Sequence, residues 1–165
     1  MVELPSDILV NSLSSEKFSI IWFEDRTIEP PHNKHYHVSV SINSDQFLIL
    51  CMITSKVQKR EAHYERRGKS ICKTCLVPID QNSFSFLTKE SVIECNQPIL
   101  LTRADLLARL APKSKLKIIA RDGSFKDTLK KEIVAAIQKS PLVKPLIKAY
   151  LNPLIEGDFR SLRSI

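Results

Sequence analysis

Only three glycines occur in this chain of 165 residues, at Gly68, Gly123 and Gly157. Loops that hold phosphates with backbone N–H groups need clustered glycines, so the sequence excludes P-loop and dinucleotide-binding proteins. Long apolar runs are also missing, since none approaches the roughly 18 residues of a transmembrane helix. The first residues carry Glu3 and Asp7 and lack the basic and apolar regions of a signal peptide. We therefore expect a cytoplasmic protein with no membrane partner.

The hydrophobic content, 43%, and the charged content, 26%, are typical of a folded domain with its own core. The net charge is +7, and it is unevenly distributed. Residues 1–55 contain three basic and seven acidic side chains, whereas residues 56–73 (KVQKREAHYERRGKSICK) contain seven basic and two acidic ones. Clustered Lys and Arg with interspersed aromatic residues suit a phosphate backbone. The alternative is a solvated loop without a partner.

The four cysteines allow several interpretations. Cys51 lies in the apolar run FLILCMI and is expected in the core. Cys72 and Cys75 form a C-x-x-C that could bind zinc or cycle as a dithiol. A structural zinc site needs four ligands, and Cys95 with a histidine would have to complete it, because no second C-x-x-C or H-x-x-x-H is present. We expect no metal and no cofactor, and interpret the pair as ordinary cysteines at the start of a strand.

Alternating hydrophobic residues predict a β-hairpin over 35–53. In HYHVSVSI, Tyr36 and Val38 lie on one face of a strand, and His35 and His37 lie on the other. An Asn-Ser-Asp turn follows, and QFLILCMI after it is typical of a central strand buried on both faces. Further strands are expected at 18–23, 74–79 and about 91–95, with 116–120 as a strand or the start of a helix, whereas 56–73 is expected as a long loop or irregular helix.

Helices are expected near both ends of the chain. SDILVNSL predicts a short N-terminal helix capped by its serine. Thr102 with Asp105 fits a capping box before ADLLARL. Ser124 with Asp127 predicts a helix whose apolar residues recur every four positions, ended by a Ser-Pro pair and followed by a second helix through PLIKAYL.

These elements predict an α+β fold in a single domain, 1–165. We expect its strands to form a small antiparallel β-barrel or curled sheet over about 18–120. A short helix precedes the barrel, and a helical extension over about 121–165 follows it. Nothing repeats internally, and no linker divides the chain.

The end of the predicted central strand is the first candidate site. Thr54 and Ser55 end this strand where the basic stretch begins, and a strand end supports ligand-binding groups rigidly. Beside Lys56, these hydroxyls could contact a phosphodiester; alternatively, they only end the strand by bonding their own backbone. The hairpin register places His35 opposite about 53–54, where it could serve as a general acid or base or have no task.

The run HYHVSVSINSDQFLILCMITSKVQKRE, with the later FLTKESVIECNQPILLTRADL and KSPLVKP, resembles the PemK/MazF-like toxin superfamily over about 18–150. The resemblance implies an SH3-like barrel with appended helices, usually a homodimer. It implies a metal-independent endoribonuclease that a cognate antitoxin, a protein or an RNA, neutralises. The better-known members carry a Gly-rich segment with a catalytic Arg where this chain has PPHNKHYHV, and here His35 or Lys34 would substitute.

The resemblance also implies roles for residues at the strand end. Thr54, Ser55 and Lys56 would contact the scissile phosphate while the RNA 2′-OH attacks it and leaves a 2′,3′-cyclic phosphate. Lys59 or Arg60 would stabilise the negative charge of the transition state. We therefore expect a toxin-like endoribonuclease for single-stranded RNA, with a non-catalytic nucleic-acid or protein binding module on the same barrel as the alternative. The side chains expected to bind RNA are Lys59, Arg60, Tyr64, Arg66, Arg67 and Lys69.

Overall fold

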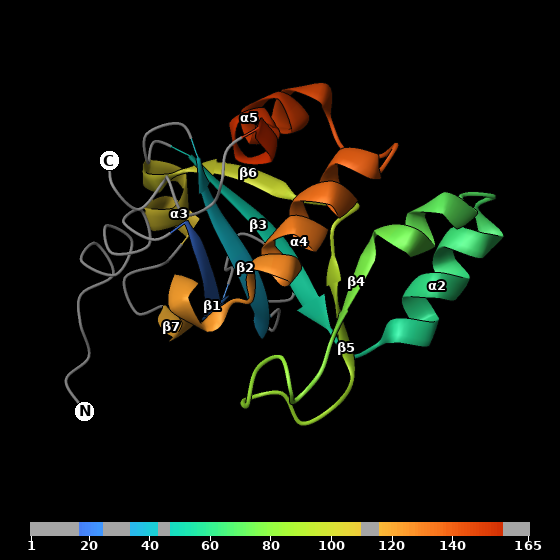
Figure 1. The fold of residues 1–165 in the computed structure, drawn as a ribbon, viewed down its shortest axis with the longest axis horizontal. Helices are drawn as coiled ribbons and strands as arrows, with labels where there is room; N and C mark the ends of the chain where they lie inside the picture. The colour runs from blue at the N-terminus through green and yellow to red at the C-terminus, as the bar shows by residue number, and fades with distance from the viewer. Residues whose placement is uncertain (1–16, 25–33, 43–46, 110–115, 157–165) are drawn as a thin grey trace. The chain divides into compact units, whose positions relative to one another are not determined.

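The structure, a computed structural model, describes residues 17–24, 34–42, 47–109 and 116–156. These residues belong to two compact units, which Figure 1 draws with the uncertain segments in grey. Unit 1 contains the residues up to Ile53 and Ile99–Ser124, and unit 2 contains Thr54–Pro98 and the residues from Phe125 onward. Each unit is thus assembled from two separate stretches of chain. The single domain expected for the whole chain stays a prediction.

Unit 1 is built on an antiparallel sheet in the order β6-β3-β2-β1-β7. The α+β class and the antiparallel pairing are therefore as the sequence predicts. No pairing among the described strands closes the sheet, so a barrel is not observed. The strands are β1 (Phe18–Glu24), β2 (Lys34–Ile42), β3 (Phe47–Thr54), β6 (Ile99–Thr102) and β7 (Lys117–Ala120).

The hairpin of β2 and β3 is confirmed. Its register runs from Ile42 opposite Phe47 to His37 opposite Met52. Consecutive residues of β3 from Leu48 to Cys51 are all buried, as expected for a strand with both faces covered. The predicted turn at 43–45 and the predicted N-terminal helix lie outside the described residues.

One face of this sheet carries a cluster of buried hydrophobic side chains, to which α3 (Arg103–Arg109) contributes Leu106. The capping box predicted for this helix is confirmed. The Asp105 N–H donates to Thr102 Oγ1 and the Thr102 N–H donates to Asp105 Oδ2, both at 3.0 Å. The other members of the cluster are Ile21, Leu48, Leu50, Leu101 and Leu116.

Unit 2 contains a β-hairpin and most of the helices (Figure 1). Strands β4 and β5 pair antiparallel, with Leu76 opposite Glu94. Helix α4 lies against β4 and the 3-10 helix η1, and α5 packs along α4. The basic stretch, expected as a loop or irregular helix, instead contains the regular helix α2. The elements are α2 (Val57–Arg66), η1 (Ser70–Cys75), β4 (Leu76–Ile79), β5 (Ser91–Glu94), α4 (Asp127–Lys139) and α5 (Pro145–Glu156).

The start of α4 differs from the prediction. The expected cap, Ser124, ends the short 3-10 helix η2 (Asp122–Ser124), and Lys126 stands at the N-cap of α4 instead. Phe125 therefore precedes the helix, although it continues the apolar pattern of the helix. Its ring is buried and lies 5.0 Å, centroid to centroid, from that of Phe84. This aromatic contact accounts for the apolar residue better than a longer helix would.

Candidate functional site

The exit of β3 leads directly into α2. Ser55 and Lys56 are exposed there, and Thr54 is half-buried. Thr54 Oγ1 accepts a hydrogen bond from the Lys56 N–H at 3.1 Å, and the Lys56 carbonyl accepts one from the Arg60 N–H at 3.1 Å. The Thr54 hydroxyl therefore stabilises the turn that leads into the helix. This is the alternative to phosphate binding, in which the hydroxyl bonds to its own backbone. Among the described residues, the proton of this hydroxyl has no acceptor.

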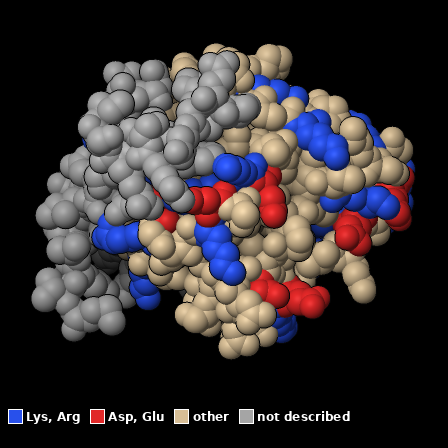
Figure 2. Space-filling view, viewed as in Figure 1, with Lys and Arg blue, Asp and Glu red and all other residues tan. Residues whose placement is uncertain are grey.

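The basic segment, residues 56–73, presents most of its cations to solvent. Two of the seven face acidic groups: Lys73 pairs with Glu65, and Arg60 Nε lies 4.0 Å from Glu94 Oε2. In Figure 2, the right-hand side of the view, where Figure 1 draws α2, carries blue and red atoms side by side. The cations that are exposed and have no ion pair within the described part of the chain are Lys56, Lys59, Arg66, Arg67 and Lys69.

Gly68 ends α2. Its φ is +66°, a left-handed conformation that glycine adopts without strain. The Gly68 N–H donates to the Glu65 carbonyl at 3.0 Å, and the Lys69 N–H donates to the Tyr64 carbonyl at 2.9 Å. This pair of bonds is a Schellman motif. Arg66 and Lys69 therefore stand at the C-terminal end of the helix, where the backbone carbonyls favour cations.

The sequence predicts that Tyr64 binds RNA, but the structure places its side chain in the interior of unit 2. Its side chain is 1% exposed, and its hydroxyl donates to Glu94 Oε2 at 2.9 Å. Burial, followed by the charge of Glu94, raises the pKa of Tyr64 far above its ordinary range. Tyr64 therefore cannot stack on a base of RNA in this structure. It holds the inner side of α2 against the rest of unit 2.

Glu94 is the centre of a buried polar network. Its Oε1 accepts from the Asn96 backbone N–H at 3.0 Å and from Asn96 Nδ2 at 2.8 Å. Asn96 Nδ2 also donates to the Cys72 carbonyl at 2.8 Å, and Ser140 Oγ donates to Asn96 Oδ1 at 2.7 Å. Every polar group in the network thus has a partner, as a buried carboxylate requires.

Sequence reasoning missed this network. Its signal is the pair Glu94 and Asn96 in SVIECNQPIL, where two polar residues interrupt an apolar strand. A charged residue inside a buried strand needs hydrogen-bond donors. The pattern could have indicated a buried acceptor, but it does not identify Tyr64 and Ser140 as the residues around it.

All four cysteines are buried, and none of them forms a disulfide. Burial raises the pKa of both Cys72 and Cys75, which lowers the thiolate fraction that nucleophilic or redox chemistry needs. The Cys95 N–H donates to the Cys75 carbonyl at 3.3 Å, so Cys75 extends the pairing of β4 with β5. Within the described ranges, no group of three His, Cys, Asp or Glu residues is arranged to hold a metal ion.

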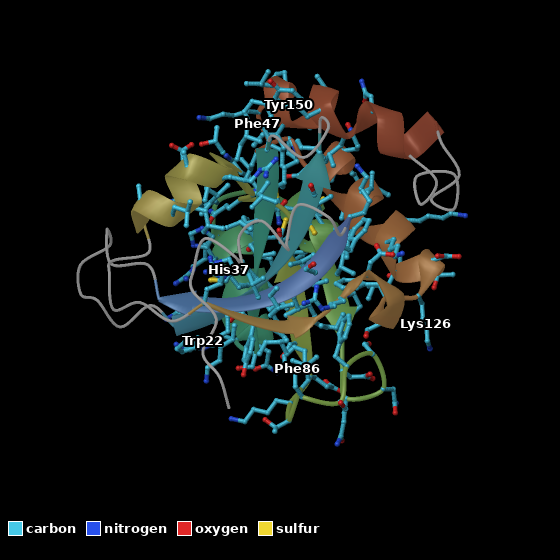
Figure 3. All side chains as sticks on the ribbon, turned by 90° about the vertical axis from the view of Figure 1, so that its left-hand side faces the viewer. Trp22, His37, Phe47, Phe86, Lys126 and Tyr150 are labelled. Atoms are coloured by element: carbon cyan, nitrogen blue, oxygen red, sulfur yellow. The ribbon has the colours of Figure 1, made fainter. Side chains whose placement is uncertain are left out.

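His35 and His37 lie on β2 of unit 1, and Figure 3 labels His37. His37 is buried, and its Nδ1 donates to the His35 carbonyl at 3.1 Å. His35 is half-buried and lies opposite Phe23 of β1. The paired residues of β2 and β3 end at His37 and Met52 and include neither His35 nor Thr54. The expected proximity of His35 to the strand exit stays a prediction.

Comparison with known proteins adds no relative to these observations. No family model matches the chain, and no curated protein matches it. Within the described residues, no helix combines the length and the apolar character needed to cross a bilayer. The chemistry of the site therefore follows from its own groups, which are a strand-end hydroxyl pair and the exposed cations of the helix after it.

Proposed function

We propose that the chain is a toxin-like, metal-independent endoribonuclease that cleaves single-stranded RNA. One observation carries this proposal: Ser55 and Lys56 are exposed at the end of a buried strand, at the start of a helix that presents further cations. A strand end holds a hydroxyl and an ammonium group rigidly, and the helix adds affinity for the phosphate backbone. The SH3-like barrel, the homodimer and the cognate antitoxin belong to the same proposal.

In the reaction, the RNA 2′-oxygen bonds to the adjacent phosphorus while the bond from phosphorus to the 5′-oxygen breaks. The products are a 2′,3′-cyclic phosphate and a 5′-hydroxyl. The hydroxyls of Thr54 and Ser55 donate to the phosphate oxygens, and Lys56 stabilises the negative charge that develops on them. His35 is the proposed acid or base for proton transfer.

The test is cleavage of end-labelled single-stranded RNA in excess EDTA. The wild-type chain is expected to yield fragments ending in a cyclic phosphate, and Ser55→Ala and Lys56→Gln to lower the rate by about tenfold or more each, as for the loss of one transition-state donor. Ser85→Ala and Lys89→Gln, at exposed positions of the same unit, are the matched controls. Equal rates in all five proteins would contradict the proposed site.

A second candidate is a non-catalytic module that binds RNA through the basic segment. It is favoured by the Thr54 hydroxyl, which already accepts a hydrogen bond within its own turn. This module would leave RNA intact and bind it with a strong dependence on salt. For single strands, the slope of log affinity against log salt is about −0.7 for each phosphate contacted. Replacing Lys59 or Lys69 by Gln should then reduce the slope by about that amount.

A further inference from the structure

Three side chains on the sheet of unit 1 form a row that the proposed cleavage site does not use. Tyr36 of β2 lies directly opposite Trp22 of β1, and Trp22 lies directly opposite Lys117 of β7. Directly opposite residues of antiparallel strands share a face, so the row crosses three neighbouring strands on one side. Lys117 Nζ lies 5.5 Å from the centroid of the Trp22 ring, a cation–π contact. We call these residues the aromatic row; Figure 3 labels Trp22.

The aromatic row lies where the buried part of the sheet ends. Two positions before Trp22 on β1 and two positions after Tyr36 on β2, Ile20 and Val38 are fully buried. In the row itself, Tyr36 is 36% exposed, Lys117 is exposed and Trp22 is half-buried. Strand alternation puts the row on the face opposite to the one that carries the α3 cluster, because Ile21 belongs to that cluster.

Two aromatic rings beside a cation on an antiparallel sheet suit unpaired nucleic-acid bases. Every base has a flat π-face that can stack on Trp or Tyr, and an adjacent ammonium group pairs with the phosphate of the same nucleotide. A duplex offers no free base faces because its bases are stacked inside. Unit 1 as a whole contains nine basic and nine acidic side chains, so the attraction for a phosphate at the row comes from Lys117 itself.

We propose that Trp22, Tyr36 and Lys117 form a base-stacking platform for single-stranded RNA. The proposal rests on the proposed function, since it assigns the binding of unpaired bases to unit 1. Stacking on Trp22 and Tyr36 supplies affinity that tolerates any base, and Lys117 binds a phosphate. The platform takes over the stacking role that the burial of Tyr64 removes from α2.

The chain has a single tryptophan, so its intrinsic fluorescence reports on the aromatic row directly. The full chain is titrated with a 2′-O-methyl oligouridylate of about 12 nucleotides, within the usual range of single-strand binding sites. This probe lacks the 2′-hydroxyl and cannot be cleaved by its attack. Saturable quenching of the Trp22 emission is expected. Heparin, a polyanion without bases, is expected to leave the emission unchanged.

Variants separate the contribution of base stacking to RNA affinity from the contributions of apolar contact and charge. Tyr36→Leu keeps an apolar side chain but removes the ring, and should weaken binding roughly 5- to 100-fold. Tyr36→Phe keeps the ring and should bind within about twofold of wild type. Lys117→Gln should weaken binding and reduce the salt slope by about 0.7. Ile99→Ser, at another exposed apolar residue of the same sheet, is the control and should leave the affinity for the oligouridylate unchanged. Circular dichroism and thermal melting establish that each variant is folded.

The outcomes distinguish this proposal from the proposed function. Wild-type affinity in folded Tyr36→Leu, or equal quenching by heparin and RNA, overturns the platform and leaves the ribonuclease proposal standing. Quenching with RNA that stays uncut under cleavage conditions supports the platform and overturns the ribonuclease. Quenching that persists in a cleavage-deficient Ser55→Ala variant supports both. No binding of RNA by the wild-type chain overturns both.

Discussion

Two tyrosines of this chain lie in similar sequence surroundings and in opposite structural ones. Tyr64 belongs to the most basic stretch and Tyr36 to a strand with neighbouring histidines, so both are reasonable RNA-binding residues by composition. In the structure, Tyr64 is buried with its hydroxyl on Glu94, whereas Tyr36 is exposed beside Trp22. The difference teaches that a basic surrounding does not make an aromatic residue accessible. Tyr64 is inaccessible because its side chain packs inside unit 2 and its hydroxyl donates to Glu94.

The largest effect is expected from removing the acceptor that buries Tyr64. Glu94→Ala leaves the Tyr64 hydroxyl and the Asn96 backbone N–H without a partner, and should lower the free energy of unfolding by about 3–5 kcal/mol. Urea denaturation measures it. Glu94→Gln keeps the shape of the side chain and should cost less. A loss below about 1 kcal/mol for Glu94→Ala would show that the network does not hold α2.

The hydroxyl of each tyrosine provides the direct comparison. Tyr64→Phe removes a buried donor to a carboxylate and should lower the free energy of unfolding by about 1–3 kcal/mol. Tyr36→Phe, at an exposed position, should change it by less than about 0.5 kcal/mol. Parallel thermal melts of the two variants check this. Equal shifts in Tm would remove the distinction between the two regions.

Alkaline pH should weaken unit 2 through the same tyrosine. The pKa of Tyr64 is raised in the folded chain by burial and by Glu94, whereas the unfolded chain titrates near its ordinary value of about 10. The unfolded state therefore loses its Tyr64 proton first. The contribution of Tyr64 to stability is fully present below about pH 10 and falls above it, by at most about 1.4 kcal/mol per pH unit. Denaturation at increasing pH measures the slope. Tyr64→Phe should make this slope less steep. Part of the slope should remain, because burial also raises the pKa of the Cys72 and Cys75 thiols.

A smaller effect than the loss of the Tyr64 hydrogen bond is expected at the exposed end of α2, where a substitution changes the backbone conformation and removes no buried partner. Gly68→Ala places a Cβ at a φ of +66° and should lower the free energy of unfolding by about 1 kcal/mol. No atom lies near the added Cβ, so the cost is purely conformational. Gly68→Asn, which tolerates this φ better, should cost less in the same denaturation assay. A larger loss for Asn than for Ala would contradict the conformational explanation.

Much of the local structure could be predicted from the chain itself. The alternation in HYHVSVSI predicts β2, the apolar run after it predicts β3, and the spacing of Thr102 and Asp105 predicts the start of α3. These signals depend on neighbours in sequence. The sequence does not predict the 3-10 helix before α4, because Ser124 is a favourable cap that lies two residues before the observed N-cap, Lys126. A contact of Phe125 with Phe84, which is distant in sequence, competes with the longer helix.

The candidate site, too, could be predicted from the sequence only in part. The sequence predicts hydroxyls and cations at the end of β3, and the structure leaves Ser55, Lys56 and Lys59 exposed there. Whether a given side chain of the basic segment faces solvent depends on which side of α2 it occupies. That side is set by Glu94, about 30 residues further along the chain.

The amino-acid sequence by itself determined most of the strands, the capping box of α3 and where positive charge accumulates, because periodicity, capping residues and charge are local properties. Only the tertiary structure decided that Tyr64 is a buried hydrogen-bond donor and that Tyr36, Trp22 and Lys117 lie in one row across three strands. Burial and strand register bring together residues that are far apart in the chain, and the free energy of those contacts has no local signature.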